Sequence, residues 1–205
     1  DGDLTTSVDH DIATASWGQR LGIDGIRVEG LTRLALNSAL LMDFDTASSA
    51  LEEGRQAAQP GGHDANLTIL EVMVTARLSM RDGDNAESLQ TLLEGIGALE
   101  RFASFYSPMA RFSAAYHLHE SGRLEEAVSQ LDTVLASKAA IASYRAVAYA
   151  GLARLYGCIE LEDRMRDAAA GARESLEAPL GPFLGSTVWA ELGLAYLAGG
   201  DTAAA

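Results

Sequence analysis

Most of the chain consists of segments in which apolar residues recur every three or four positions, separated by short segments rich in Gly, Asp and Pro. This spacing places the apolar side chains on one face of a helix. Abundant Ala and few runs of β-branched residues favour the same all-helical structure. The pattern predicts ten helices, at about 4–21, 27–42, 45–58, 66–80, 85–102, 109–120, 124–137, 139–156, 162–177 and 183–198.

A Gly- or Asp-containing turn recurs along the chain at a nearly constant spacing. The turns at Gly2, Met42, Gly83 and Gly122 are 40, 41 and 39 residues apart, and Gly200 follows 78 residues later, or two repeats of about 39. A small residue follows each turn at one offset: Ser7, Ala47, Ser88, Ala127 and Ala205. In the fourth repeat this anchor lies between Arg164 and Ala168. The period predicts five helix-pair repeats in a single domain, 1–205, that is part of a longer array.

The last repeat carries the most specific motif. Trp189, Leu192, Gly193 and Tyr196 form W-x-x-L-G-x-x-Y, and Gly200-Asp201 follows. This pattern resembles the first half of a tetratricopeptide repeat. The resemblance implies an all-α, right-handed superhelix of antiparallel helix pairs, a tetratricopeptide-like α-solenoid. It also implies that Trp189 packs in the core, with an exposed apolar edge nearby.

Charge and composition restrict the range of partners. With 29 acidic and 15 basic residues, the net charge is −14, which disfavours direct binding of nucleic acids or anionic membranes. No apolar run is long enough for a membrane span, and we expect a cytoplasmic protein. The single cysteine, Cys158, excludes an internal disulfide, and its neighbours predict a buried structural thiol.

Two titratable clusters resemble reactive sites but have simpler interpretations. His117 and His119 are two residues apart, so on a helix they point to different sides and do not chelate one metal ion. Asp9-His10-Asp11 is expected to form a solvated face of its helix. The apolar positions of the same helix include Val8, Ile12, Ala15 and Trp17. No hydrolase, phosphate-loop, zinc or paired-cysteine motif is present. We therefore expect no enzymatic activity, no cofactor and no metal.

The candidate binding surface is the inner groove that, in tetratricopeptide repeats, is lined by the first helix of each pair. The resemblance places on it Thr32, Met73, Arg77, Phe112, Tyr116 and His119. Met73, Phe112 and Tyr116 could equally be ordinary packing residues. Arg77 is more informative, because an arginine among Val and Met residues needs an acidic neighbour or an anionic ligand.

Two functions remain open at this point. The period of about 40 resembles the longer superhelix of large bacterial LuxR-type regulators, which implies a domain that binds a small-molecule inducer or a protein in its groove and regulates transcription. The alternative is a stand-alone scaffold or adaptor that binds an extended peptide. In either case the ends of the array are expected to be uncapped, which predicts self-association.

Overall fold

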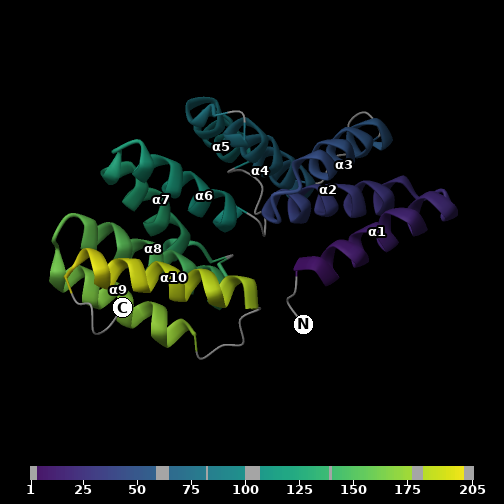
Figure 1. Ribbon diagram of the computed structural model, residues 1–205. Coiled ribbons are helices and arrows are strands. Elements are labelled where there is room, and N and C mark those ends of the chain that lie inside the picture. The colour runs from purple at the N-terminus through teal and green to yellow at the C-terminus, as the bar shows by residue number, and fades with distance from the viewer. Residues whose placement is uncertain are drawn as a thin grey trace. The chain divides into compact units, whose positions relative to one another are not determined.

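A computed structural model describes residues 4–58, 65–81, 83–99, 107–138, 140–176 and 182–200. These residues form ten α-helices joined in sequential antiparallel pairs, so the predicted all-α fold of helix pairs is confirmed (Figure 1). The helices are α1 Leu4–Leu21, α2 Asp24–Leu40, α3 Phe44–Ala57, α4 Ala65–Arg81, α5 Asn85–Leu99, α6 Ser107–Glu120, α7 Leu124–Ala136, α8 Ala142–Cys158, α9 Glu162–Ser175 and α10 Pro182–Ala198.

The recurring turn has one backbone geometry. Its central residue has a positive φ, which is 83° at Gly83, 73° at Gly122 and 79° at Gly200. After Gly83 and Gly122 the next residue donates its N–H to a carbonyl five positions earlier: Asp84 to Ser79 at 3.0 Å, and Arg123 to Leu118 at 2.8 Å. This is the Schellman ending of a helix, which favours glycine because glycine has no Cβ.

The same geometry fixes the register of the fourth repeat. Glu160 has φ 59°, and the Leu161 N–H reaches the Tyr156 carbonyl at 2.9 Å, so Glu160 is the turn residue. The anchor position five residues later is Met165, which is 2% exposed. The anchor therefore lies inside the predicted interval, but it is a large residue where the other repeats have a small one.

The aspartate of the turn caps the following helix. The Asp43 carboxylate accepts the Thr46 N–H at 3.2 Å, and the Asp84 carboxylate accepts the Glu87 N–H at 2.8 Å. Each carboxylate satisfies a backbone donor that has no partner within its helix. The Gly-Asp pair thus ends one helix and caps the next.

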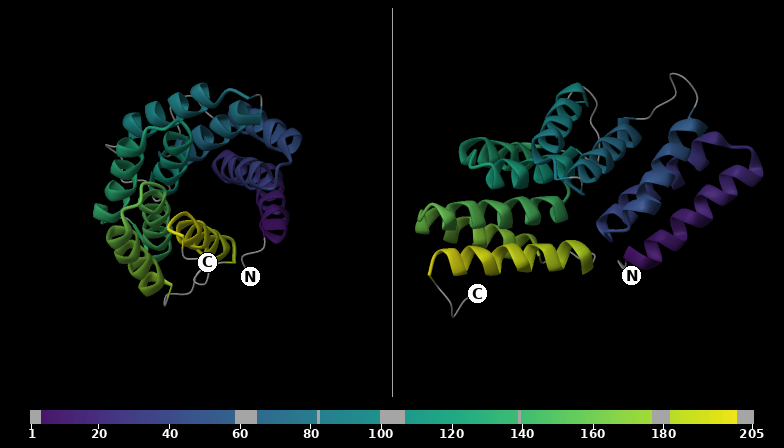
Figure 2. Two further views of the ribbon diagram at one scale, coloured as in Figure 1. Left: turned by 60° about the vertical axis from the view of Figure 1, so that its left-hand side comes forward. Right: turned by 45° about the horizontal axis from the view of Figure 1, so that its top comes forward.

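The chain divides into two compact units, and the first comprises Asp1–Ser107. Its central helix is α2, which packs against α1, α3 and α4, while α5 packs against α4 (Figure 2). Helix α1 approaches α2 very closely, since a Cβ on Gly30 would lie 2.5 Å from the Ala15 backbone nitrogen. Buried side chains of this unit include Leu31, Ala35, Leu51, Leu70 and Leu92.

The close approach of α1 and α2 corrects part of the predicted orientation of α1: Ala15 faces α2 as expected, but Ile12, Trp17 and Asp11 do not lie where the pattern places them. Ile12 and Trp17 are 46% and 62% exposed, whereas Asp11 is 1% exposed. The contact face runs along Asp11, Ala15 and Gly18 because the backbones meet there. Asp11 accepts a hydrogen bond from Asn37 Nδ2 at 2.7 Å and lies 3.2 Å from Arg33 Nε. Burial raises the pKa of Asp11, and these two partners oppose the shift.

The second unit comprises Pro108–Ala205 and is organised around α8. Helix α8 packs against α7, α9 and α10, which lie beside it in Figure 2, and Arg111 Nη1 joins α6 to α7 through Gln130 Oε1 at 2.7 Å. A Cβ on Gly157 would lie 2.7 Å from the Ala195 carbonyl oxygen, so α8 and α10 are in close contact. The buried side chains include Leu118, Leu131, Val134, Leu152 and Leu192.

Two sequence predictions about this unit are wrong. Cys158 is exposed, because it ends α8 beside the turn, one residue after the buried Gly157. Trp189 is 58% exposed rather than in the core. Helix α10 buries Val188 and Leu192 against its neighbours, and Trp189 lies about 100° round the helix from Val188.

The exposure of Trp189 has a parallel one repeat earlier. The equivalent residue there is Tyr149, which α9 covers through Gly171, whose added Cβ would lie 3.0 Å from the Tyr149 ring. Within the described residues no helix takes that place beside α10. Leu194 and Leu197 are 44% and 54% exposed, so the predicted apolar edge is present. None of the described helices is long and apolar enough to cross a membrane.

Candidate peptide-binding surface

One position of the repeat organises the candidate surface. It lies six residues before the positive-φ turn residue, on the first helix of each pair, and we call it the groove position. In chain order it is occupied by Leu36, Arg77, Tyr116, Arg154 and Leu194. Two residues of the predicted groove, Arg77 and Tyr116, are therefore equivalent, although one is a cation and the other an aromatic ring.

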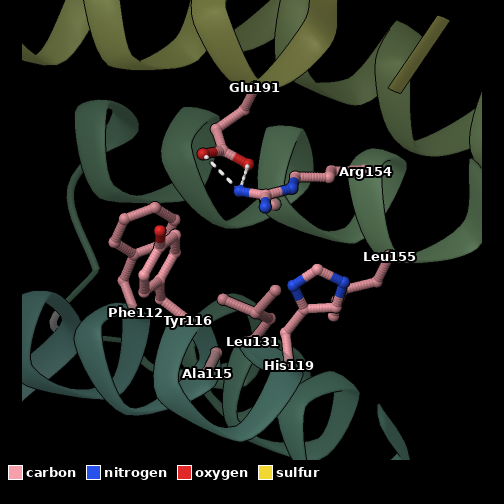
Figure 3. A pocket seen from close by; sticks show the side chains of 9 residues that line it. Phe112, Ala115, Tyr116, His119, Leu131, Arg154, Leu155 and Glu191 are labelled. Atoms are coloured by element: carbon pink, nitrogen blue, oxygen red, sulfur yellow. Dashed lines mark hydrogen bonds and ion pairs between the residues drawn. The ribbon is translucent and has the colours of Figure 1, made fainter. Parts of the chain in front are cut away.

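In the second unit the first helices enclose a hollow of about 270 Å³, a volume that includes open solvent at its mouth. Three predicted groove residues of α6 meet there, and Figure 3 shows their side chains directed toward residues of α8 and α10. The hollow is lined by Phe112, Ala115, Tyr116, His119, Leu131, Gly151, Arg154, Leu155 and Glu191. Phe112, Tyr116 and His119 thus form one site.

Arg154 is the centre of the hollow. Its Nη1 lies 3.2 Å from Glu191 Oε1 and 3.4 Å from Oε2, and its Nη2 lies 3.6 Å from Glu120 Oε1. The guanidinium also lies over the Tyr116 ring, 5.5 Å from the centroid. Three first helices therefore converge on one cation, and an arginine fork is well suited to hold several such partners at once.

The charge balance of the hollow is mixed. Burial raises the pKa of Glu191, while the charge and hydrogen bonds of Arg154, and the charge of His119, oppose that shift. His119 Nδ1 lies 3.4 Å from Glu120 Oε1. The Tyr116 side chain remains 41% exposed beside these groups. The hollow thus offers an aromatic ring together with paired charges.

The other predicted groove residues lie in the first unit. Thr32 is 5% exposed and donates its hydroxyl to the Val28 carbonyl at 2.8 Å, and Met73 is 2% exposed. Both side chains pack in the core of that unit, and their contact with a ligand stays a prediction. Arg77 is half-buried, and burial lowers the pKa of its guanidinium. Among the described residues it has neither a hydrogen-bond nor an ion-pair partner.

Sequence reasoning missed Arg154 and Glu191. Arg154 could have been found by counting six residues back from Glu160, but a turn without glycine hid the register of that repeat. Glu191 has no comparable signal, because it stands at an unspecified position between Trp189 and Leu192 of the motif. In the described part of the chain, no three His, Cys, Asp or Glu residues are placed to hold a metal ion.

Comparison with known proteins shows the fold and no more. No family model matches the chain, and no curated protein is similar to it in sequence. The crystal structure of BtubC (BKLC) from P. vanneervenii is similar, with a TM-score of 0.68 and 19% sequence identity over 99% of this chain and 87% of that chain. The likeness supports a tetratricopeptide-like arrangement of helix pairs.

Proposed function

We propose that this chain is a protein-binding scaffold that holds an extended peptide segment against the first helices of its second unit. The observation that carries the proposal is the solvent-open hollow at Tyr116, which combines an exposed ring with the paired charges of Arg154 and Glu191. Rings and arginines of this kind dominate the binding energy of protein interfaces. The tetratricopeptide-like fold, shared with BtubC, is also consistent with protein partners.

The size of the hollow favours a peptide over a small-molecule inducer. Its volume of about 270 Å³, open solvent included, is below the roughly 300–1,000 Å³ typical of small-molecule sites. A space of this size suits one side chain of a longer ligand, whose remaining residues lie along neighbouring helices of the second unit. A role in transcription regulation has no support beyond the repeat period, and stays a prediction, as does self-association through the ends of the array.

The test is a peptide selection with the full chain. Random peptides displayed on phage are selected on the wild-type protein. The dissociation constants of the selected peptides are then measured by calorimetry for the wild type and for Tyr116→Ala. We expect the substitution to weaken binding by about tenfold or more, because it removes the exposed ring of the site.

Asp132→Ala is the matched control, since Asp132 is an exposed residue of the second helix α7. Peptides that bind equally well to wild type and Tyr116→Ala would place the binding surface elsewhere. Failure to select any peptide would contradict the scaffold proposal itself.

A further inference from the structure

The repeat places two arginines at equivalent positions with opposite surroundings. Arg154 and Arg77 both occupy the groove position, six residues before a turn residue of positive φ. Arg154 is held by two carboxylates, Glu191 at 3.2 Å and Glu120 at 3.6 Å, and by the Tyr116 ring. Arg154 is thus an arginine at the groove position whose charge is balanced within this protein.

Arg77 lacks such a partner. It follows an apolar stretch of α4 in which Met73 is 2%, Val74 0% and Ala76 1% exposed. The side chain itself is half-buried, and within the described residues no acceptor or carboxylate is paired with it. Other arginines of the first unit are paired: Arg55 Nε lies 2.7 Å from Glu71, and Arg27 Nη2 lies 2.7 Å from Glu53.

A guanidinium stays protonated throughout the physiological range, so loss of a proton cannot remove its charge. A half-buried cation without a counter-charge is unfavourable for folding, because burial takes away water without supplying an acceptor. An anion supplied by a ligand would restore the missing interaction. It would bind with the two parallel hydrogen bonds that a guanidinium forms with a carboxylate.

We propose that Arg77 is a carboxylate-binding site that takes one acidic group of a peptide bound to the first unit. This inference rests on the proposed scaffold function and names the chemistry of its ligand. The net charge of −14 disfavours strongly acidic partners, so the expected segment carries one carboxylate at this place in an otherwise neutral or basic sequence.

Two sources could supply the carboxylate, and the experiment separates them. Peptides selected on the wild-type protein are remade with each Asp or Glu replaced by Asn or Gln, and separately with an amidated C-terminus. An acidic side chain is the source if one of the first changes weakens binding, and the terminal carboxylate is the source if amidation does.

The decisive measurement is a double-mutant cycle between that carboxylate and Arg77. Removing the carboxylate should weaken binding to the wild type by about 10- to 100-fold, and should have almost no effect on binding to Arg77→Met. Arg77→Lys should retain part of the effect, because it keeps the charge but not the fork. Arg55→Met is the control and should behave like the wild type.

Equal weakening in wild type and Arg77→Met, or no dependence on any carboxylate, would overturn the proposal while leaving the scaffold function intact. Thermal unfolding of the free protein provides a readout that needs no peptide. Arg77→Met should melt at a higher temperature than the wild type. A lower melting temperature would mean that Arg77 already has a partner inside the protein, and this result would also overturn the proposal.

Discussion

The two units place different residues at equivalent positions of the repeat, and the differences separate charges that are paired within the fold from charges that are not. At the groove position, Arg154 of the second unit is neutralised by Glu191 and Glu120, whereas Arg77 of the first unit is unpaired within the described chain. The backbone is equivalent at both places. Neighbouring side chains therefore decide whether an arginine at this position is paired within the fold or left without a counter-charge.

The turns differ between the units in a similar way. Asp43 and Asp84 cap the second helices of the first unit, while Arg123 and Leu161 occupy that position in the second and form no side-chain cap. The turn residue itself differs within each unit: it is glycine at Gly83 and Gly122, and Met42 and Glu160 at the other two turns. Each contrast can be tested by exchanging one residue.

The largest effect is expected for Arg154→Met, which leaves Glu191 buried without its counter-charge. We expect unfolding free energy to fall by about 2 kcal/mol at neutral pH, less than for a fully buried pair because both groups retain some solvent. Urea denaturation measures this change. Arg166→Met is the control, because Arg166 is an exposed residue paired within its own helix.

This destabilisation should depend on pH. Burial raises the pKa of Glu191, so the folded state holds a proton more tightly than the unfolded chain. Stability from this residue is therefore present below the ordinary glutamate pKa of 4.5 and is lost as pH rises through the folded pKa. In Arg154→Met the stability lost with rising pH should be larger, because no arginine then balances the ionised Glu191 carboxylate. A deficit in Arg154→Met that is the same below pH 4.5 as at neutral pH would contradict this account.

Arg77→Met is expected to have the opposite sign. Replacing an unpaired half-buried cation by an apolar side chain of similar length should raise the unfolding free energy by about 1 kcal/mol. The same urea titration measures it, with Arg55→Met beside it to report the loss of a paired surface arginine. If Arg77→Met and Arg154→Met both lowered the unfolding free energy, the contrast between the units would disappear.

A turn residue other than glycine should destabilise the fold by an amount comparable to that expected for Arg77. Glu160 has φ 59°, a conformation that costs a residue with a side chain about 1 kcal/mol. Glu160→Gly should recover most of this, as a rise in melting temperature. Glu160→Ala is the matched control, since it removes the same charge but keeps the Cβ. Equal stabilisation by both substitutions would assign the effect to charge instead of backbone.

The smallest effect is expected at the helix caps. The hydrogen bonds from Thr46 lower the pKa of Asp43, so its contribution is present above the ordinary aspartate pKa of 3.8 and is lost as pH falls through the folded pKa. Asp43→Ala should therefore lower the melting temperature at neutral pH and not in strong acid. Asp132→Ala should change it at neither pH.

The features that could be predicted from the sequence are those that depend on local spacing. Helix α1 begins and ends where the pattern places it. Positive φ values occur at Gly22, Gly83, Gly122 and Gly200, and glycine is the residue type that adopts them most readily. Phe112, Tyr116 and His119 share a helix face, so their meeting in one hollow follows from the period.

The features that could not be predicted depend on contacts between distant elements. Asp11 is buried because Gly18 and Gly30 let two helix backbones approach, and the apolar pattern of α1 contains no sign of that contact. Trp189 is exposed because, among the described helices, none covers its side of α10. Arg154 and Glu191 are 37 residues apart, and their pairing requires knowledge of which helices are neighbours.

The uniform turn also bears on how such a chain can change in length. Each turn satisfies its own backbone groups within a few residues, so its geometry does not depend on the identity of the helices before and after it. A segment of about 40 residues cut at two equivalent turns carries a whole helix pair and leaves matching ends behind. Duplication or deletion of such segments therefore alters the number of groove positions in a single genetic step, without a new kind of junction.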